Sequence, residues 1–195
     1  MDLKGSLIGI SAVAGAGKDT VFTLMSKEFQ KTGYNPLRFA FADRLKKNID
    51  PFLTNHLGIG AFTRVDYEKD IIRPLLVAYG ETMRGAVEDY WVDVVEEQMF
   101  LFKEQHDKRD ARMMAIVTDV RYENEARRLK NLGGKILHIE RDGVVAPNES
   151  EKKNAPLVRA MADSILSWPT FEDEKEINSK GLDMVKGMVK ELIDD

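Results

Sequence analysis

The sequence contains no cysteine, no excess of basic residues and no long uninterrupted hydrophobic run. The lack of cysteine excludes a disulfide framework and a thiolate site, so a reducing compartment is the simpler expectation. The formal net charge of −4 provides no overall positive field, which disfavours a nucleic-acid partner. No segment approaches the roughly 18 apolar residues of a membrane span. We therefore expect a cytoplasmic protein that does not bind membranes.

The apolar stretch from Leu7 to Ala16 ends in small residues, as the apolar part of a signal peptide does. This stretch is rich in Gly, Ser and Ala rather than Leu, and Lys18 and Asp19 follow at once. We therefore interpret it as part of the folded protein. A chain of 195 residues has the ordinary size of one domain, and we expect a single domain over residues 1–195.

Short apolar runs alternate along the chain with segments of helical periodicity. The predicted strands cover residues 7–11, 37–41, 113–120, 135–139 and 164–167. The predicted helices cover residues 20–32, 43–55, 70–87, a stretch around 91–102, 123–132 and a closing helix from 182. Residues 141–162 lack clear periodicity, which indicates an irregular, lid-like segment. The alternation predicts a three-layer α/β fold with a parallel central sheet, helices on both faces and a ligand site at the carboxyl ends of the strands.

The stretch IGISAVAGAGKDTV, residues 8–21, lies between the first predicted strand and the first predicted helix. When the Gly-Lys of the Walker A pattern G-x-x-x-x-G-K-[ST] is aligned on Gly17 and Lys18, Ala12 replaces the first Gly and Asp19 replaces Ser or Thr. Small residues let backbone N–H groups approach an anion, and the lysine reaches the β- and γ-phosphates. The alternative is a Gly/Ala-rich turn with an incidental lysine and an aspartate N-cap. We predict an ATP phosphate site formed by Gly15, Ala16, Gly17, Lys18, Asp19 and Thr20.

Two carboxylates are candidate ligands for Mg²⁺. Asp19 stands where a hydroxyl normally binds the metal, and a carboxylate can replace it directly or through water. Asp119 ends an apolar strand, as a Walker B aspartate does; a turn or helix-cap role is the alternative. Arg121 lies two residues further on and would point to the same side of an extended chain. An Asp and an Arg exposed at the end of a strand are more typical of a ligand-binding site than of a hydrophobic core.

Segments that resemble the bacteriophage-type deoxynucleoside monophosphate kinases follow one another in order from about residue 8 to 167. They are GAGKDT (15–20), FADRLK (41–46), KDIIRPLLVAYGETMR (69–84), YWV (90–92) and TDVRYENEARRLKNLGG (118–134). The resemblance implies a P-loop kinase fold of the adenylate kinase type that transfers the γ-phosphoryl group of ATP, with Mg²⁺, to a deoxynucleoside 5′-monophosphate.

The same resemblance implies roles for individual residues. It places the acceptor nucleotide in a helical region of about residues 43–105 and near the end of the third predicted strand. Its acceptor residues are Asp43, Arg73, Glu81, Arg84 and Arg121. Arg121 parallels the arginine of the Asp-Gly-x-Pro-Arg segment of adenylate kinases, which holds the acceptor phosphate. Arg141 and Arg159, from the lid-like segment 141–162, would close over the transferring group and bind ATP.

The chemistry of a phosphate acceptor agrees with these residue types. Its second pKa is about 6, so it is mostly a dianion at pH 7 and needs no general base. Catalysis then requires alignment and charge neutralisation, which we assign to Lys18, Asp119 and Arg121.

Several alternatives stay open. A P-loop kinase could act on a hydroxyl acceptor, such as a nucleoside or dephospho-coenzyme A, with Asp43 as general base, and a non-catalytic ATP-binding module is a further candidate. Surface ion pairing, for example of Glu81 with Arg84, is the alternative for the arginines of residues 70–87. The sequence decides neither the accepted bases nor whether the chain forms a homodimer.

Overall fold

The computed structural model describes residues 3–108, 112–146 and 148–194. The chain forms two compact units. The first, here called the sheet unit, comprises Met1–Phe39 and Met99–Asp195, and the second, the helical unit, comprises Ala40–Gln98. Helix α4 (Tyr90–Asp107) begins in the helical unit and ends in the sheet unit. In the part of the chain that the structure describes, no helix is long and apolar enough to span a membrane.

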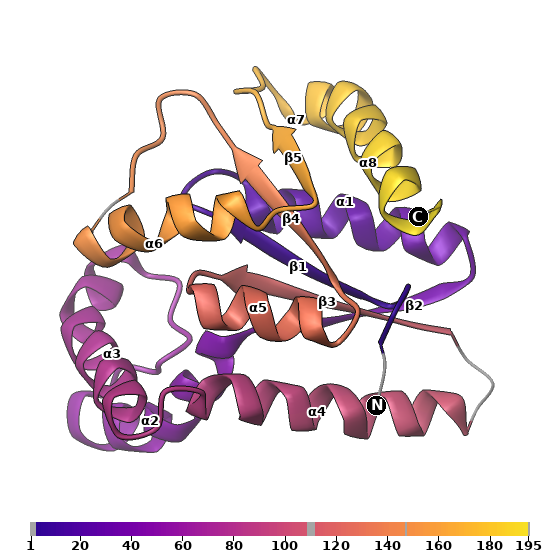
Figure 1. The fold of residues 1–195 in the computed structure, drawn as a ribbon. Helices are drawn as coiled ribbons and strands as arrows, with labels where there is room; N and C mark the ends of the chain where they lie inside the picture. The colour runs from indigo at the N-terminus through magenta and orange to yellow at the C-terminus, as the bar shows by residue number, and fades with distance from the viewer. Residues whose placement is uncertain (1–2, 109–111, 147, 195) are drawn as a thin grey trace. The chain divides into compact units, whose positions relative to one another are not determined.

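The sheet unit is built on five parallel strands (Figure 1). They are β1 (Leu7–Ala12), β2 (Tyr34–Phe39), β3 (Arg112–Val120), β4 (Lys135–Glu140) and β5 (Ser164–Ser167), in the order β2-β3-β1-β4-β5. Residues Met113–Thr118 of β3 are all buried, as expected for a strand inside a parallel sheet with both faces covered. Pro36, which cannot donate a backbone hydrogen bond, lies in β2 at the edge of the sheet.

Helices cover both faces of this sheet (Figure 1). On one face α1 (Lys18–Lys31) packs against α8 (Leu182–Asp194), and on the other α5 (Glu123–Asn131) packs against α6 (Glu149–Ala160). A short helix α7 (Glu174–Glu176) and a π-helical turn η1 (Ile177–Gly181) lead into α8. The predicted α/β fold with a parallel sheet and three layers is therefore confirmed.

The core between the sheet and the α1/α8 layer follows from the periodicities of its elements. Alternate residues of β1, such as Ile8 and Ile10, face the side of α1 that carries Val21, Met25 and Phe29. All five side chains are at most 3% exposed. Because one strand face and one helix face are buried together, they fix how α1 lies on the sheet, and hence where its N-terminus lies.

The connections of β1 and β3 create the crevice in which open α/β sheets bind ligands. From β1 the chain passes through α1 to β2, on the far side of β3; from β3 it passes through α5 to β4, on the far side of β1. The chain thus leaves these adjacent strands in opposite directions and over opposite faces. Such a reversal of strand order marks the ligand crevice at the carboxyl ends. Ser11 of β1 lies beside Val120 of β3, so the residues that follow both strands meet there.

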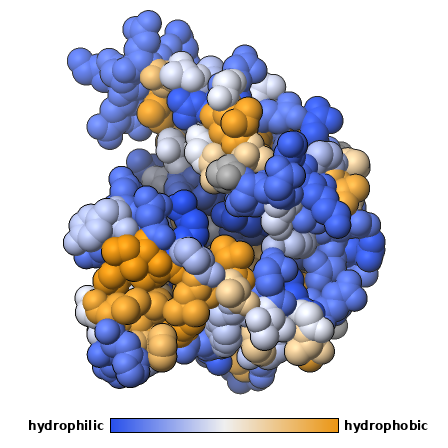
Figure 2. Space-filling model, turned by 90° about the vertical axis from the view of Figure 1, so that its left-hand side faces the viewer, coloured by the Kyte–Doolittle hydropathy of each residue, from blue (hydrophilic) through white to orange (hydrophobic). Residues whose placement is uncertain are grey.

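The helical unit consists of α2 (Phe41–Leu57), α3 (Asp66–Ala86) and the beginning of α4. Leu53, Ala61 and Ile72 form one buried cluster in it. Gly80 makes the close approach of α2 and α3 possible, because a Cβ atom there would lie 2.8 Å from Cδ1 of Leu45. Figure 2 shows apolar residues gathered in one part of the face that it displays. Exposed apolar side chains of this unit include Phe52, Leu57, Phe62, Val65, Ile71 and Val77.

Three predicted boundaries or segments were wrong. The strand predicted at 37–41 runs from Tyr34 to Phe39, and Phe41 already begins α2. Helix α3 begins at Asp66 and continues through Pro74 and Gly80 to Ala86. The segment 141–162 is not irregular throughout, since α6 occupies Glu149–Ala160. Its helical pattern is hidden because Pro156 interrupts it and because one of its two buried residues, Glu151, is charged.

Candidate phosphate-binding site

The loop predicted to bind phosphates connects β1 directly to α1. Ala12 is the last residue of β1 and has the extended backbone of a strand, so the first glycine of the Walker A pattern is not needed there. Gly15 and Gly17 have φ angles of 87° and 97°, which side chains strongly disfavour. Between them, the backbone N–H of Ala16 donates to the carbonyl of Val13 at 3.2 Å. The strand, glycine-rich loop and helix predicted from the sequence are all present.

The N-terminus of α1 is suited to an anion. Its N-cap is Gly17, which has no side chain to accept the first N–H groups of the helix, so the alternative of an aspartate N-cap is wrong. Asp19 lies in the first turn with its side chain 80% exposed, and its carboxylate is 3.8 Å from Nζ of Lys18. Lys18 is 24% exposed, and Thr20 in the same turn is half-buried. A positive side chain and a helix dipole converge at this end of the loop.

Trp168 packs against the end of the loop at Gly17. Its indole is buried, and its backbone N–H extends the β4–β5 ladder by donating to the carbonyl of Glu140 at 2.7 Å. A Cβ atom at Gly17 would lie 2.7 Å from Cδ1 of this indole, and one at Gly181 of the π-helical turn would lie 2.9 Å from its Cη2. Trp168 therefore requires glycine on both sides. No sequence pattern signals this contact, because Trp168 and Gly17 lie far apart in the chain.

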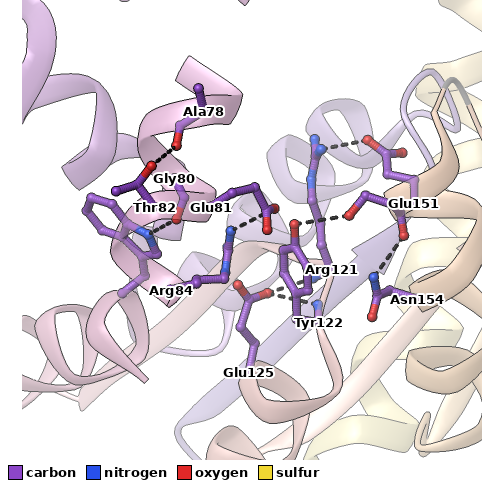
Figure 3. A network of polar contacts seen from close by, with 12 residues as sticks. Ala78, Gly80, Glu81, Thr82, Arg84, Arg121, Tyr122, Glu125, Glu151 and Asn154 are labelled. Atoms are coloured by element: carbon purple, nitrogen blue, oxygen red, sulfur yellow. Dashed lines mark hydrogen bonds and ion pairs between the residues drawn. The ribbon is translucent and has the colours of Figure 1, made fainter. Parts of the chain in front are cut away.

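Arg121 follows β3 directly and is held at both ends (Figure 3). Its backbone N–H donates to Oε2 of Glu125 at 2.8 Å, and its Nη1 donates to Oε1 of Glu151 at 2.6 Å. The other oxygen of Glu151 accepts the backbone N–H of Ala14, in the loop, at 3.1 Å. One carboxylate thus joins the predicted phosphate clamp to the predicted phosphate loop.

Sequence reasoning missed Glu151. It lies three residues after Asn148, the N-cap of α6, whose Oδ1 accepts the backbone N–H of Glu151 at 2.8 Å. This N-x-x-E spacing is typical of a helix start with a capping box. The spacing signals a helix and an acidic residue at its third position, yet it carries no information about the distant residues that the carboxylate contacts.

The two arginines assigned to the lid lie at different places on the sheet unit. Arg141 follows β4 and lies against the loop, where its Nη1 is 3.5 Å from the carbonyl oxygen of Gly15 and its Nε and Nη2 each donate to Oγ1 of Thr170 at 3.2 Å. Arg159, near the end of α6, forms an ion pair with Glu140. This contact raises the pKa of the guanidinium and lowers the pKa of Glu140, in both cases mainly through the hydrogen bond between them.

Asp119 is the second candidate Mg²⁺ ligand. It is half-buried at the end of β3, one residue before Val120, which lies beside Ser11 of β1. Within residues 3–108, 112–146 and 148–194, no group of three or more His, Asp or Glu side chains is arranged to hold a metal. Mg²⁺ in phosphate sites is usually bound by one or two carboxylates together with phosphates and waters. Asp19 and Asp119 offer carboxylate oxygens of the kind that this mode uses, in which phosphates and waters would supply the remaining ligands.

A polar pair lies on the adjacent strands β1 and β4, close to the point where β1 passes into the loop. Ser11 and His138 are register partners on β1 and β4, and Nδ1 of His138 is 3.2 Å from Oγ of Ser11. Both side chains are buried. Burial lowers the pKa of His138 from its ordinary value of 6.5, the nearby Glu140 opposes this shift, and Arg159 adds to it. A neutral imidazole is therefore favoured behind the loop.

The remaining acceptor residues belong to the helical unit. Asp43 is half-buried in the first turn of α2. On α3, Arg73 lies 3.3 Å from Asp70, and Arg84 lies 3.7 Å from Glu81, which are the surface ion pairs expected as the alternative. Because α3 is continuous, the 11 residues between Arg73 and Arg84 make about three turns and place both on one helix face.

No protein-family model and no curated protein sequence matches this chain. Among solved structures, it is similar to shikimate kinase from Bacteroides thetaiotaomicron (12% identity, TM-score 0.46, covering 97% of this chain and 99% of that chain). Shikimate kinase from Acinetobacter baumannii in complex with shikimate gives 11% identity and a TM-score of 0.43, with 97% and 93% of the two chains covered. A gluconokinase from Sinorhizobium meliloti 1021 gives 12% identity and a TM-score of 0.40, with 98% and 97% covered. Similarities at this level assign neither a family nor a substrate to this chain.

Proposed function

We propose that this protein is a phosphotransferase that uses Mg²⁺ and ATP to phosphorylate a deoxynucleoside 5′-monophosphate. The observation that carries the proposal is the junction of the loop with Arg121 through Glu151. In this proposal the ATP phosphate site and an arginine for the second phosphate would share one crevice, at the ends of two adjacent strands.

The proposed roles follow from charge and position. Backbone N–H groups of residues 15–20 would bind the ATP phosphates, with Lys18 neutralising charge on the transferring group. Arg121 would hold the acceptor phosphate, because a guanidinium forms paired hydrogen bonds with phosphate oxygens. Asp119 and Asp19 would hold Mg²⁺, which supplies further charge neutralisation when bound. Arg141 would contact ATP from the side of Gly15.

Some proposed roles rest on the resemblance alone. These are the acceptor contacts of Asp43, Arg73, Glu81 and Arg84, and the contact of Arg159 with ATP. The choice of a monophosphate acceptor also depends on the resemblance, together with the argument that a phosphate dianion needs no general base. An acceptor hydroxyl would need such a base, for which Asp43 is the candidate.

An acceptor panel tests the proposal directly. ADP release is measured with ATP and Mg²⁺ against deoxynucleoside monophosphates, ribonucleoside monophosphates, nucleosides and dephospho-coenzyme A. Shikimate and gluconate are included because kinases named for them are among the similar solved structures. We expect turnover with at least one deoxynucleoside monophosphate. Turnover with hydroxyl acceptors only would assign the alternative kinase class, and ATP binding without any turnover would assign a binding module.

A further inference from the structure

The first turn of α6 holds the segment that follows β3 by two side chains. Oε1 of Glu151 accepts from Arg121 at 2.6 Å, and Oγ of Ser150 lies 3.2 Å from the hydroxyl of Tyr122 (Figure 3). Two neighbouring residues of one helix thus contact two neighbouring residues of one strand end. The direction in which Arg121 leaves the sheet is therefore set by α6 as well as by β3.

The carboxylate of Glu151 is fixed in place. It is 8% exposed, and burying a charge is costly unless hydrogen bonds compensate for it. Compensation comes from the guanidinium of Arg121, from the N–H of Ala14, and from the N-terminal end of α6, where a negative charge is favoured. Since Arg121 and Ala14 belong to two different segments, neither of them part of α6, Glu151 has little freedom to turn away.

Arg121 keeps donors for another anion in this arrangement. A guanidinium has five N–H donors in a rigid plane, and the contact with Glu151 is made from Nη1. Its side chain is 43% exposed, so the plane is not enclosed by the protein. A carboxylate on one edge of the plane fixes how the other edges are directed.

We propose that Glu151 is a positioning residue that directs Arg121 toward the acceptor phosphate and sets its distance from the loop. This inference rests on the proposed function, because it assigns the acceptor phosphate to Arg121. Glu151 itself contacts neither nucleotide. It acts by holding a guanidinium and a loop N–H on the two oxygens of one carboxylate.

The variant Glu151→Gln tests this role while keeping the shape of the side chain. Glu151 accepts from two donors, whereas a glutamine amide has one acceptor oxygen and one NH₂ donor, so it cannot satisfy both. We expect the KM for the acceptor to rise about tenfold, as for one lost charge-assisted hydrogen bond, and the KM for ATP to change less than threefold. Glu149→Gln is the matched control, because it removes the same charge from the same helical turn at a side chain that is 91% exposed.

A double-mutant cycle separates positioning from a merely structural role. If Glu151 acts through Arg121, then Arg121→Ala together with Glu151→Gln should be no slower, within about twofold, than Arg121→Ala alone. Independent, multiplicative losses would overturn the inference. It would equally be overturned if Glu151→Gln behaved like Glu149→Gln, or if it bound ATP more tightly and turned over faster, since the carboxylate would then only obstruct the site.

A second measurement keeps this inference distinct from the proposed function. The Nε–Hε NMR signal of Arg121, assigned by its loss in Arg121→Lys, reports the order of the guanidinium without substrates. We expect a rigid signal in the wild type and in Glu149→Gln, and a mobile one in Glu151→Gln. If the wild type phosphorylates no monophosphate, the proposed function fails, and the assignment of Arg121 to an acceptor fails with it. A signal that stays rigid in Glu151→Gln rejects the positioning role itself.

Discussion

Gly17 lies directly against the indole of Trp168, with 2.7 Å between Cδ1 of the indole and the place where a Cβ atom of residue 17 would be. The contact joins the start of α1 to the end of β5, two elements that lie far apart in the sequence. The loop that we propose as the phosphate site is thereby supported by a buried aromatic side chain. The height of the loop above the sheet depends on residue 17 having no side chain.

Gly17→Ala should destabilise the protein for two reasons. The φ angle of 97° is unfavourable for alanine by about 1–2 kcal/mol, and the clash with Trp168 adds about 1–3 kcal/mol of overpacking. Gly15→Ala is the matched control, because its φ angle is 87° but its Cβ atom would meet only Cγ1 of Val144, at an ordinary 3.8 Å. Denaturant unfolding should give the larger decrease in the free energy of unfolding for Gly17→Ala. Equal decreases in the two variants would mean that the Trp168 side chain can move aside at no cost in free energy.

Lys18→Ala should leave the fold intact and reduce turnover by about two to three orders of magnitude, because it removes charge neutralisation in the transition state. Steady-state kinetics measure the loss, and circular dichroism checks the fold. Lys27→Ala, an exposed lysine of the same helix, is the control and should retain full activity. A loss of less than about tenfold in Lys18→Ala would place the chemistry away from this loop.

Asp19→Ala should raise the Mg²⁺ concentration needed for half-maximal activity, because it removes an exposed carboxylate next to the phosphate loop. Asp19→Ser should restore much of the wild-type Mg²⁺ dependence, since serine supplies the hydroxyl of the usual Walker A pattern. Both are read from activity titrations with Mg²⁺ at constant ATP. An unchanged titration in Asp19→Ala would remove this residue from the metal site.

Stability should fall as the pH decreases through about 6.5, and His138 should account for part of the loss. Burial disfavours the charged imidazole, so the pKa of His138 is lower in the folded protein than its ordinary value of 6.5. Below pH 6.5 the unfolded chain binds this proton while the folded protein does not, which favours unfolding. The contribution of neutral His138 to the free energy of unfolding is fully present above pH 6.5. It is lost as the pH falls toward the pKa of His138 in the folded protein.

Denaturant midpoints between pH 7.5 and 5.5 measure this effect. His138→Gln should show a smaller decrease than the wild type, because its side chain does not titrate and can still bond to Ser11. His56→Gln, which replaces an exposed imidazole of the helical unit, is measured beside it for comparison. Equal slopes in His138→Gln and the wild type would contradict the prediction.

Most of the sheet unit could be predicted because its signals are local. An apolar run followed by a glycine-rich loop and a helical periodicity places β1, residues 13–17 and α1 within one or two residues of the observed elements. The short strands β3, β4 and β5 were predicted with similar accuracy for the same reason. In contrast, α6 has no apolar stripe, because the residues that it buries include a glutamate whose partners lie elsewhere.

The sequence by itself determined the parallel α/β fold, the glycine-rich loop between β1 and α1, and the position of Arg121 at the end of a strand. Only the tertiary structure decided that Glu151 joins Arg121 to Ala14 and that Trp168 supports Gly17. Ala14 and Glu151 are 137 residues apart. Backbone propensity and periodicity act over a few neighbouring residues, whereas the choice of a partner for a buried charge or an indole depends on where sheet packing brings distant segments together.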